Sequence, residues 1–240
     1  FYASYTSNAW SAPLAVDPTS TATDAEPSVA YRIDGTAVVA WVRDGDRSLS
    51  TLNDRQIAQR QLTPGSPVVV ENGLPGGAAE PSLAINSAGD LLLAYTVATD
   101  PLAFIGDQRQ LHAAQRTCGG QGCAWSDQAL TDANGRPVHA ESPTLILNGS
   151  GQALIAYRAL GFGPAYPGAP TVLKGDALGT ILGTGEVAQA SVSFSNNIIT
   201  PSYKTNAGKT IWQIAAVYDP LLNQVYTVGS QGSGPSLPSV

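Results

Sequence analysis

The feature that most constrains the fold of this chain is a sequence pattern that recurs four times. The copies read "EPSVAYRIDGTAVVAWVRD" from Glu26, "EPSLAINSAGDLLLAYTVATD" from Glu80, "SPTLILNGSGQALIAYRAL" from Ser142 and "TPSYKTNAGKTIWQIAAVYD" from Thr200. In each copy a Pro followed by Ser or Thr leads into a short apolar run. A glycine follows seven or eight positions later, and a second apolar run ends near an aromatic residue. The prolines stand at positions 27, 81, 143 and 201, which are 54, 62 and 58 residues apart, and this spacing indicates a repeated supersecondary unit.

Each copy predicts a strand, a glycine-containing turn and a second strand, because the apolar runs are short and bounded by turn residues. Two further strands are expected in each unit. The third strands would be "RQIAQRQL" (55–62) and "RQLHAAQRT" (109–117), and the fourth "SPVVVENGL" (66–74) and "AWSDQALTD" (124–132). At the N-terminus, "YASYTS" (2–7) and "AWSAPLAV" (9–16) take the same two places. Four-stranded antiparallel units of this length predict an all-β propeller.

We expect a single propeller domain over residues 1–240, with repeat units starting near residues 26, 80, 142 and 200. Four to five blades are visible in the sequence. Residues 1–16 would complete the closing blade, so that N- and C-terminal strands close the ring and leave no open sheet edge. The alternative is that the visible blades form a sector of a larger propeller.

The composition excludes several classes of partner. The net charge of −6 and the pI near 4.7 argue against nucleic acid, whose phosphates require a basic face. No apolar run of about 18 residues is present, so no membrane insertion is expected. We expect that any signal peptide has been removed from this chain.

The two cysteines occur in "CGGQGC", as Cys118 and Cys123. A structural zinc site needs four ligands, which one pair of thiols does not supply. Four small or flexible residues between the two thiols instead favour a disulfide across the turn between a third and a fourth strand. Such a bond implies an oxidising compartment, so an extracellular or cell-surface location is predicted. Two reduced thiols in a cytosolic protein are the alternative.

The repeat units resemble those of the sialidase-like propellers with Asp-box repeats, as found in large secreted or cell-surface bacterial proteins. In that family an "EPS-apolar" strand precedes a "G…Y" strand, and a turn rich in Ser, Asp, Gly and Trp joins the third and fourth strands. "YTSNAWSAP" (5–13) is similar to a degenerate form of that turn and keeps Ser7, Asn8 and Trp10. The resemblance implies the blade architecture over the whole chain.

The resemblance does not by itself imply activity, since one fold hosts many functions. A sialidase-like site needs three converging arginines, a Tyr/Glu nucleophile pair and an Asp acid, and no arginine here lies in a motif that marks it as one of the three. Glu26, Glu80 and Glu141 precede the Pro-Ser/Thr pairs and follow the blade period, which favours structural caps over catalytic acids. His112 and His139, the only histidines, lie in no zinc or Ser–His–Asp motif. The sequence therefore predicts that the protein is not an enzyme.

The stretch "DGDRSLSTLNDR" (44–55) gathers Asp44, Asp46 and Asp54 in the connection between two strands. It does not fit an EF-hand loop, because Leu49 replaces the glycine and Arg55 the bidentate glutamate. Three interpretations stay open: a solvated structural turn, a peripheral Ca²⁺ site and a set of catalytic acids. The turn is favoured, and calcium is the only cofactor for which the sequence offers a candidate site.

Aromatic residues in long connections are the remaining candidates for a binding surface, namely Phe104, Phe162 and Tyr166. The leading hypothesis is a non-enzymatic extracellular module for protein–protein assembly or adhesion, whose partners are other proteins or cell-surface polymers. One alternative is a carbohydrate-binding, lectin-like propeller that binds glycans. The other is a sector of a glycoside hydrolase or sialidase-like enzyme.

Overall fold

The computed structural model describes residues 1–48, 51–98, 109–120, 122–159, 186–204, 210–222 and 224–232. Within these ranges the chain forms five antiparallel sheets and no helix, so no helix of the described part could cross a membrane. The first sheet contains β3 (Thr23–Tyr31), β4 (Ala37–Asp44), β5 (Arg55–Gln61) and β6 (Val69–Val70). The second contains β7 (Ala78–Ile85), β8 (Leu91–Ala98), β9 (Arg109–Gly119) and β10 (Gly122–Ala129). The third contains β11 (Ala140–Leu147), β12 (Ala153–Ala159), β13 (Glu186–Val192) and β14 (Ser202–Lys204).

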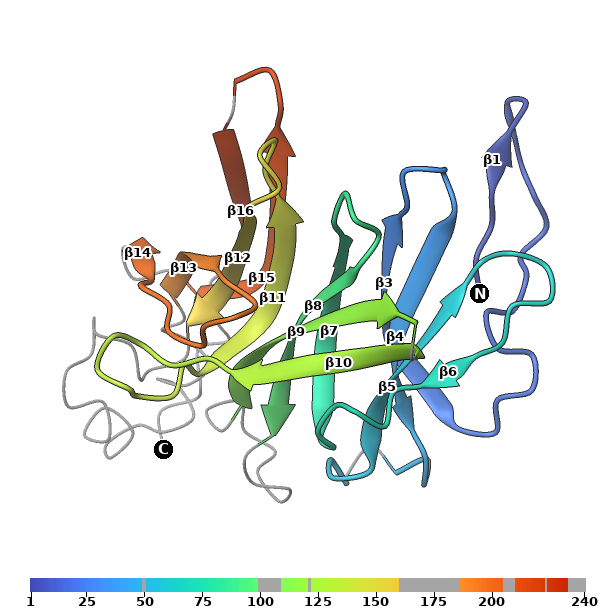
Figure 1. Cartoon of the computed structure of the whole chain (residues 1–240), viewed down its shortest axis with the longest axis horizontal. Helices are drawn as coiled ribbons and strands as arrows, with labels where there is room; N and C mark the ends of the chain where they lie inside the picture. The colour runs from blue at the N-terminus through green and yellow to red at the C-terminus, as the bar shows by residue number, and fades with distance from the viewer. Residues whose placement is uncertain are drawn as a thin grey trace.

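Two smaller sheets flank these three. The N-terminal hairpin pairs β1 (Tyr5–Thr6) with β2 (Ala9–Trp10), and the C-terminal one pairs β15 (Thr210–Asp219) with β16 (Gln224–Gly232). The sheets follow one another across the molecule in chain order (Figure 1). β3 contacts β7, β7 contacts β11 and β11 contacts β15, so the inner strands of successive sheets are neighbours. The expected all-β architecture of antiparallel sheets is confirmed, and three of the five described sheets have four strands, whereas no pairing between described strands closes a ring.

Three of the repeated glycines form the turn between the first and second strands of a four-stranded sheet. Gly35, Gly89 and Gly151 have φ values of 83°, 86° and 77°, a conformation that other residues rarely adopt. Each donates its backbone N–H to the carbonyl three residues earlier, at 2.9, 3.0 and 2.8 Å. The Asn148 side chain accepts the backbone N–H groups of Ser150 and Gln152 in the third of these turns. Residues 148–151 therefore form a turn that is closed by the Gly151 N–H and held by the Asn148 side chain.

The repeated Pro-Ser/Thr pair lies inside the inner strand instead of at its start. The register between first and second strands shifts between Ala25 and Ser28, and again between Ala79 and Ser82. Each shift is a β-bulge that contains the proline, and a bulge is a place where a strand tolerates the missing N–H. This explains why the inner strands begin several residues before the proline.

The serine of each pair links one sheet to the next. Ser28 Oγ accepts the backbone N–H of Leu83 at 2.9 Å, and Ser82 Oγ accepts that of Leu145 at 2.9 Å. These hydrogen bonds satisfy backbone donors on the inner strand of the following sheet, which would otherwise lack a partner within their own sheet. The repeat therefore specifies the interface between units as well as the unit itself.

The core lies between the sheets. One cluster joins the first and second sheets through residues such as Ile57, Leu83 and Leu93, and another joins the second and third through Leu111, Leu130 and Ile155. The second strands are buried on both faces, as their apolar sequences predict: β8 has seven buried residues in succession.

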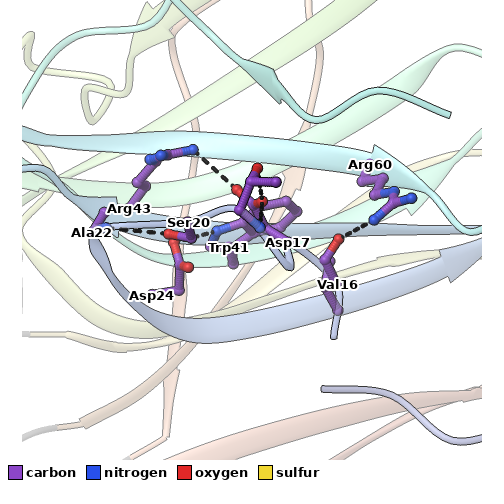
Figure 2. Close-up of polar contacts among 9 residues, drawn as sticks. Val16, Asp17, Ser20, Ala22, Asp24, Trp41, Arg43 and Arg60 are labelled. Carbon is purple, nitrogen blue, oxygen red and sulfur yellow. Dashed lines mark hydrogen bonds and ion pairs between the residues drawn. The ribbon is translucent and has the colours of Figure 1, made fainter. Parts of the chain in front are cut away.

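The face of the first sheet that is turned away from the second sheet is covered by the segment that follows the N-terminal hairpin. Arg43 pairs with Asp17 at 3.2 Å, Trp41 Nε1 donates to Asp24 at 2.9 Å, and Arg60 donates to the carbonyl of Val16 (Figure 2). Val16 also packs against the cluster of Val39, Trp41 and Ala58. A single connecting segment thus occupies the place that a full neighbouring sheet occupies elsewhere.

Two strand assignments differ from the sequence-based ones. Residues 200–203 were expected to start a fourth unit, but Ser202–Lys204 forms β14 and pairs with β13 of the third sheet. Residues 2–16 form a hairpin, with a further bridge between Tyr2 and Leu14, but no described strand from the C-terminal part pairs with it.

Candidate functional site

The candidate site lies at the end of the sheets where the inner strands β3, β7 and β11 begin, which we call the entry end. β4, β8 and β12 finish at this end, and β5 and β9 start there. Side chains from three sheets can therefore meet here without being close in sequence. The charged residues that do so are Glu26, Glu80, Glu141, Arg109 and Arg158, which we call the glutamate–arginine cluster.

The backbone is unusual where the glutamates enter. Glu26 and Glu80 have φ values of 53° and 54°, and Ser142, at the matching position of the third sheet, has φ 49°. The left-handed region is unfavourable for residues with a side chain, at a cost on the order of 1–3 kcal/mol each. This left-handed conformation recurs at the bulge of each inner strand, always at the residue that precedes the proline.

The two glutamates of the first and second sheets are adjacent. Glu26 Oε2 accepts the backbone N–H of Glu80 at 2.5 Å. Glu80 Oε2 in turn accepts the Thr96 hydroxyl at 3.2 Å and lies 3.5 Å from Arg109 Nη1. These contacts hold the Glu80 carboxylate in place, since all its partners are donors or cations.

The third sheet adds an arginine where the other two have uncharged residues. Arg158 pairs across the bulge with Glu141, at the position that Val42 and Thr96 occupy in their sheets. Its side chain is only 5% exposed. Burial lowers the pKa of Arg158 from its ordinary value, Glu80 opposes that shift, and Arg109 adds to it. Arg109 and Arg158 are therefore close enough to repel each other, and Glu80 and Glu141 compensate their charge.

The members of the cluster differ in how much of each side chain is exposed. The side chains of Glu80 and Arg109 are 22% and 24% exposed, so a ligand at the entry end can reach them. Arg158 is 5% exposed and its partner Glu141 17%. The arrangement offers a carboxylate and a guanidinium that a ligand can reach, close to an arginine that is almost fully buried.

Asp44, Asp46 and Asp54 also meet at the entry end, on the connection from β4 to β5. Each offers a carboxylate oxygen, and these atoms lie within 4.8 Å of one another. Burial, followed by the nearby Asp54 charge, raises the pKa of Asp44, although Arg55 acts in the opposite sense. Asp46 has its pKa lowered by hydrogen bonds from the Thr51 hydroxyl and the Ser48 backbone. The structure thus brings together the three aspartates that the sequence singles out.

A second polar group lies within the second sheet. The Tyr95 hydroxyl donates to Asp127 Oδ1 at 2.6 Å, and His112 Nδ1 lies 3.1 Å from Asp127 Oδ2. Tyr95 is fully buried, and burial together with the Asp127 charge raises the pKa of its hydroxyl. We assign this group to the packing of the sheet, since it fixes an outer strand against the aromatic position of the repeat.

The remaining candidates from the sequence divide into two sets. Cys118 and Cys123 form the expected disulfide, with a Cα–Cα distance of 4.0 Å across the β9–β10 turn. The candidate binding aromatics lie outside the described residues, and these are Phe104, Phe162 and Tyr166. His139 makes a backbone bridge with Gln110.

The glutamate–arginine cluster was missed by sequence reasoning. A search for linear motifs finds nothing, because its members come from positions 26 to 158 and meet only when three sheets stand side by side. One signal was available: Arg158 interrupts an apolar second strand at a position that is uncharged in the first two copies. A buried charge needs a partner, so this position indicates a cluster.

Comparison with known proteins gives likeness of fold only. No family model matches the chain, and no curated protein matches it. A protein of unknown function from Dyadobacter fermentans superposes with a TM-score of 0.61 at 13% identity, covering 89% of this chain and 63% of its own. A family 117 glycoside hydrolase from the marine bacterium Zobellia galactanivorans gives a TM-score of 0.51 at 10% identity, with 82% and 60% covered. An endo-arabinase from Bacteroides thetaiotaomicron gives 0.49 at 13% identity, with 88% and 70% covered.

These comparisons correct one prediction. The chain was expected not to be an enzyme, but it shares its fold with a family 117 glycoside hydrolase at a TM-score of 0.51, so this is a fold that an enzyme uses. The expectation failed for a physical reason, because it rested on the lack of a linear catalytic motif. In radially arranged sheets a site is assembled from separate units. The chain spans 63% of the Dyadobacter fermentans protein and 60% of the family 117 glycoside hydrolase, and the fold that they share with it is propeller-like.

Proposed function

We propose that this protein is a carbohydrate-active propeller that binds a glycan at the entry end and hydrolyses one of its glycosidic bonds. The observation that carries the proposal is the meeting of Glu26, Glu80 and Arg109 from two adjacent sheets. Glycoside hydrolysis requires two carboxyl groups on either side of the scissile bond, and adjacent glutamates on neighbouring inner strands supply them.

The two glutamates have different surroundings, which suggests different roles. Glu80 is held by Arg109 and the Thr96 hydroxyl, so it suits the carboxylate that stabilises the positively charged transition state, as nucleophile or as base toward water. Glu26 is exposed on the first sheet and would deliver the proton to the leaving oxygen. Water supplies the hydroxyl that ends on the anomeric carbon. If Glu80 is the nucleophile, the proton of that water returns to Glu26; if Glu80 is the base, Glu80 takes the proton and solvent exchange restores both groups.

Arg109 would orient the substrate. A guanidinium with 24% of its side chain exposed can donate to sugar hydroxyls or to an acidic group while Glu80 fixes its position. Arg158 and Glu141 would act as positioning residues, because their ion pair is mostly buried beneath Glu80.

The test is a screen of the purified chain against aryl glycosides of different sugars, sialosides included, and against polysaccharides, with release of reducing ends as readout. Glu80→Gln and Glu26→Gln should each lower kcat/KM by about 10²-fold or more, the usual effect of losing a catalytic carboxyl group. Glu71→Gln makes the same chemical change at a buried glutamate beside Arg116 and should leave activity unchanged. Circular dichroism of each variant controls for folding.

The outcomes separate the possible readings. Binding of a glycan without turnover, lost in Arg109→Ala, would leave a lectin-like function and overturn hydrolysis. Wild-type protein that neither binds nor cleaves any glycan, or Glu80→Gln with full activity, would overturn the proposal.

Three finer expectations belong to the same proposal. We infer an extracellular or cell-surface location, supported by the Cys118–Cys123 disulfide, since such bonds persist in oxidising compartments. We also infer that a closed ring forms through N- and C-terminal strands, and that residues 5–13 are a degenerate Asp-box turn. Ser7 and Asn8 support the latter with φ values of 51° and 62°, which a tight hairpin turn requires.

A further inference from the structure

The Asp44/Asp46/Asp54 group has an unsatisfied oxygen at its buried side. Asp44 is 2% exposed as a residue, and its Oδ1 atom is buried without a hydrogen-bond partner. Asp54 Oδ1 is also buried and unpartnered. Buried carboxylate oxygens are normally satisfied, so two in one group leave room for a further partner.

The remaining oxygens are arranged by the loop itself. Asp54 Oδ2 accepts the backbone N–H of Asp46 at 2.9 Å, and Asp46 accepts the Ser48 N–H at 2.7 Å and the Thr51 hydroxyl at 2.7 Å. These bonds fix the positions of the Asp46 and Asp54 carboxylates. One oxygen from each of the three aspartates lies within 4.8 Å of the others, and this is a spacing that ligands of a single ion adopt.

The charge balance favours a divalent cation. Three carboxylates carry three negative charges, and Arg55 offsets one of them through Nε, 3.4 Å from Asp44 Oδ2. Two negative charges remain in a group whose innermost member is buried. Oxygen-only ligands on a loop suit Ca²⁺ better than Zn²⁺, which prefers nitrogen and sulfur, or Mg²⁺, which demands strict octahedral geometry.

We propose that Asp44, Asp46 and Asp54 form a calcium-binding site that ties the β4–β5 connection to the end of β4. Asp44 supplies the buried ligand, and Asp46 and Asp54 supply ligands from the loop. The site does not depend on the proposed glycan chemistry. It lies at the entry end, so bound calcium would also stiffen one wall of the region that holds Glu26.

The experiment measures calcium binding directly. The chain is stripped with EDTA, dialysed, and titrated with CaCl₂ by calorimetry. Its melting temperature is followed with and without about 5 mM of the ion, which is about 500 times the weakest dissociation constant of calcium-sensor sites, about 10⁻⁵ M. We expect one ion per chain and a rise in melting temperature of several degrees. Asp46→Asn and Asp54→Asn should each weaken binding at least tenfold.

Two controls keep the result interpretable. Asp34→Asn changes an exposed aspartate in the turn between β3 and β4, at the opposite end of the first sheet, and should bind calcium like the wild type. Asp44→Asn can fail to fold because Asp44 is buried beside Arg55, which is why the two loop variants carry the test. Wild-type protein that shows no binding and no melting shift at millimolar calcium would overturn the proposal. Binding that both loop variants retain unchanged, or that magnesium reproduces at equal concentration, would also overturn it.

Discussion

The first and second sheets carry the same sequence pattern, yet they differ in how much of it is buried. Val29 in β3 and Leu83 in β7 occupy equivalent positions, two residues after Pro27 and Pro81, and are 53% and 6% exposed. Leu83 packs into the cluster between the two sheets. Val29 instead lines a hollow together with Tyr5 and Trp10 of the N-terminal hairpin. The pattern therefore specifies a strand, whereas the neighbour determines whether that strand is core.

The outer strands differ in the same direction. β10 has eight residues and pairs along most of β9, whereas β6 has two and pairs with β5 at only two positions. The second sheet has the Cys118–Cys123 disulfide at the β9–β10 turn, and it also has a polar link from Tyr95 to Asp127. The first sheet relies on Arg43 and Arg60 to fasten its covering segment (Figure 2). The disulfide and the buried hydrogen bond thus occur in the sheet whose fourth strand is long.

The largest expected effect comes from truncating the equivalent residues Leu83 and Val29. Leu83→Ala removes a buried side chain between two sheets and should lower the free energy of unfolding by about 2–5 kcal/mol. Val29→Ala, the same truncation on an exposed strand, should change it by about 0.5 kcal/mol or less. Urea titrations of both variants measure the difference. A large loss in Val29→Ala would mean that another part of the protein covers β3 in solution.

The disulfide should account for the next largest difference between the sheets. Replacing both cysteines in Cys118→Ser/Cys123→Ser should cost about 2 kcal/mol, the value expected for so short a closed loop. Hydrogen exchange of the β10 amides should become faster, while that of β5 should not change. Reductant added to the double variant is the control, because it should have no further effect. Unchanged exchange in β10 would show that the strand pairing alone holds this hairpin.

The sequence predicts the strands and turns of each unit, but it does not predict the contacts between units. Alternating apolar runs, Pro27 and Pro81, and glycines such as Gly89 predict strands and turns, since these preferences are local. The disulfide and the meeting of the three aspartates also depend on short segments. What the sequence did not reveal is that residues 202–204 join the third sheet and that Glu80 reaches Arg109, because contacts between sheets have no periodic signature along the chain.

Removing one hydroxyl tests the polar link of the second sheet. Tyr95→Phe keeps the ring in the core but removes the donor to Asp127, and it should cost about 1.5 kcal/mol, as for a hydrogen bond to a charged group. Asp24→Asn in the first sheet should cost less, because the amide oxygen can still accept from Trp41 Nε1 and the site is exposed. Thermal melts of the two variants give the comparison. Equal losses would mean that exposure does not distinguish these two links.

The smallest effect should come from the hydrogen bonds between successive sheets, and it should be the same at both interfaces. Equal effects would show that the sheets differ in what covers their free face and not in how they contact the next sheet. Ser28→Ala removes the acceptor for the Leu83 N–H, and Ser82→Ala removes the acceptor for the Leu145 N–H, both bonds being 2.9 Å long. Each variant leaves one backbone donor without its partner on a buried residue, so each should cost about 1 kcal/mol in urea unfolding. Ser87→Ala, in an exposed turn, is the control and should cost nothing measurable. If Ser28→Ala were much milder than Ser82→Ala, the first interface would be as loosely held as the exposed face of β3. Equal costs would instead show that the repeat fixes each interface identically and that the two sheets differ only in what covers their other side.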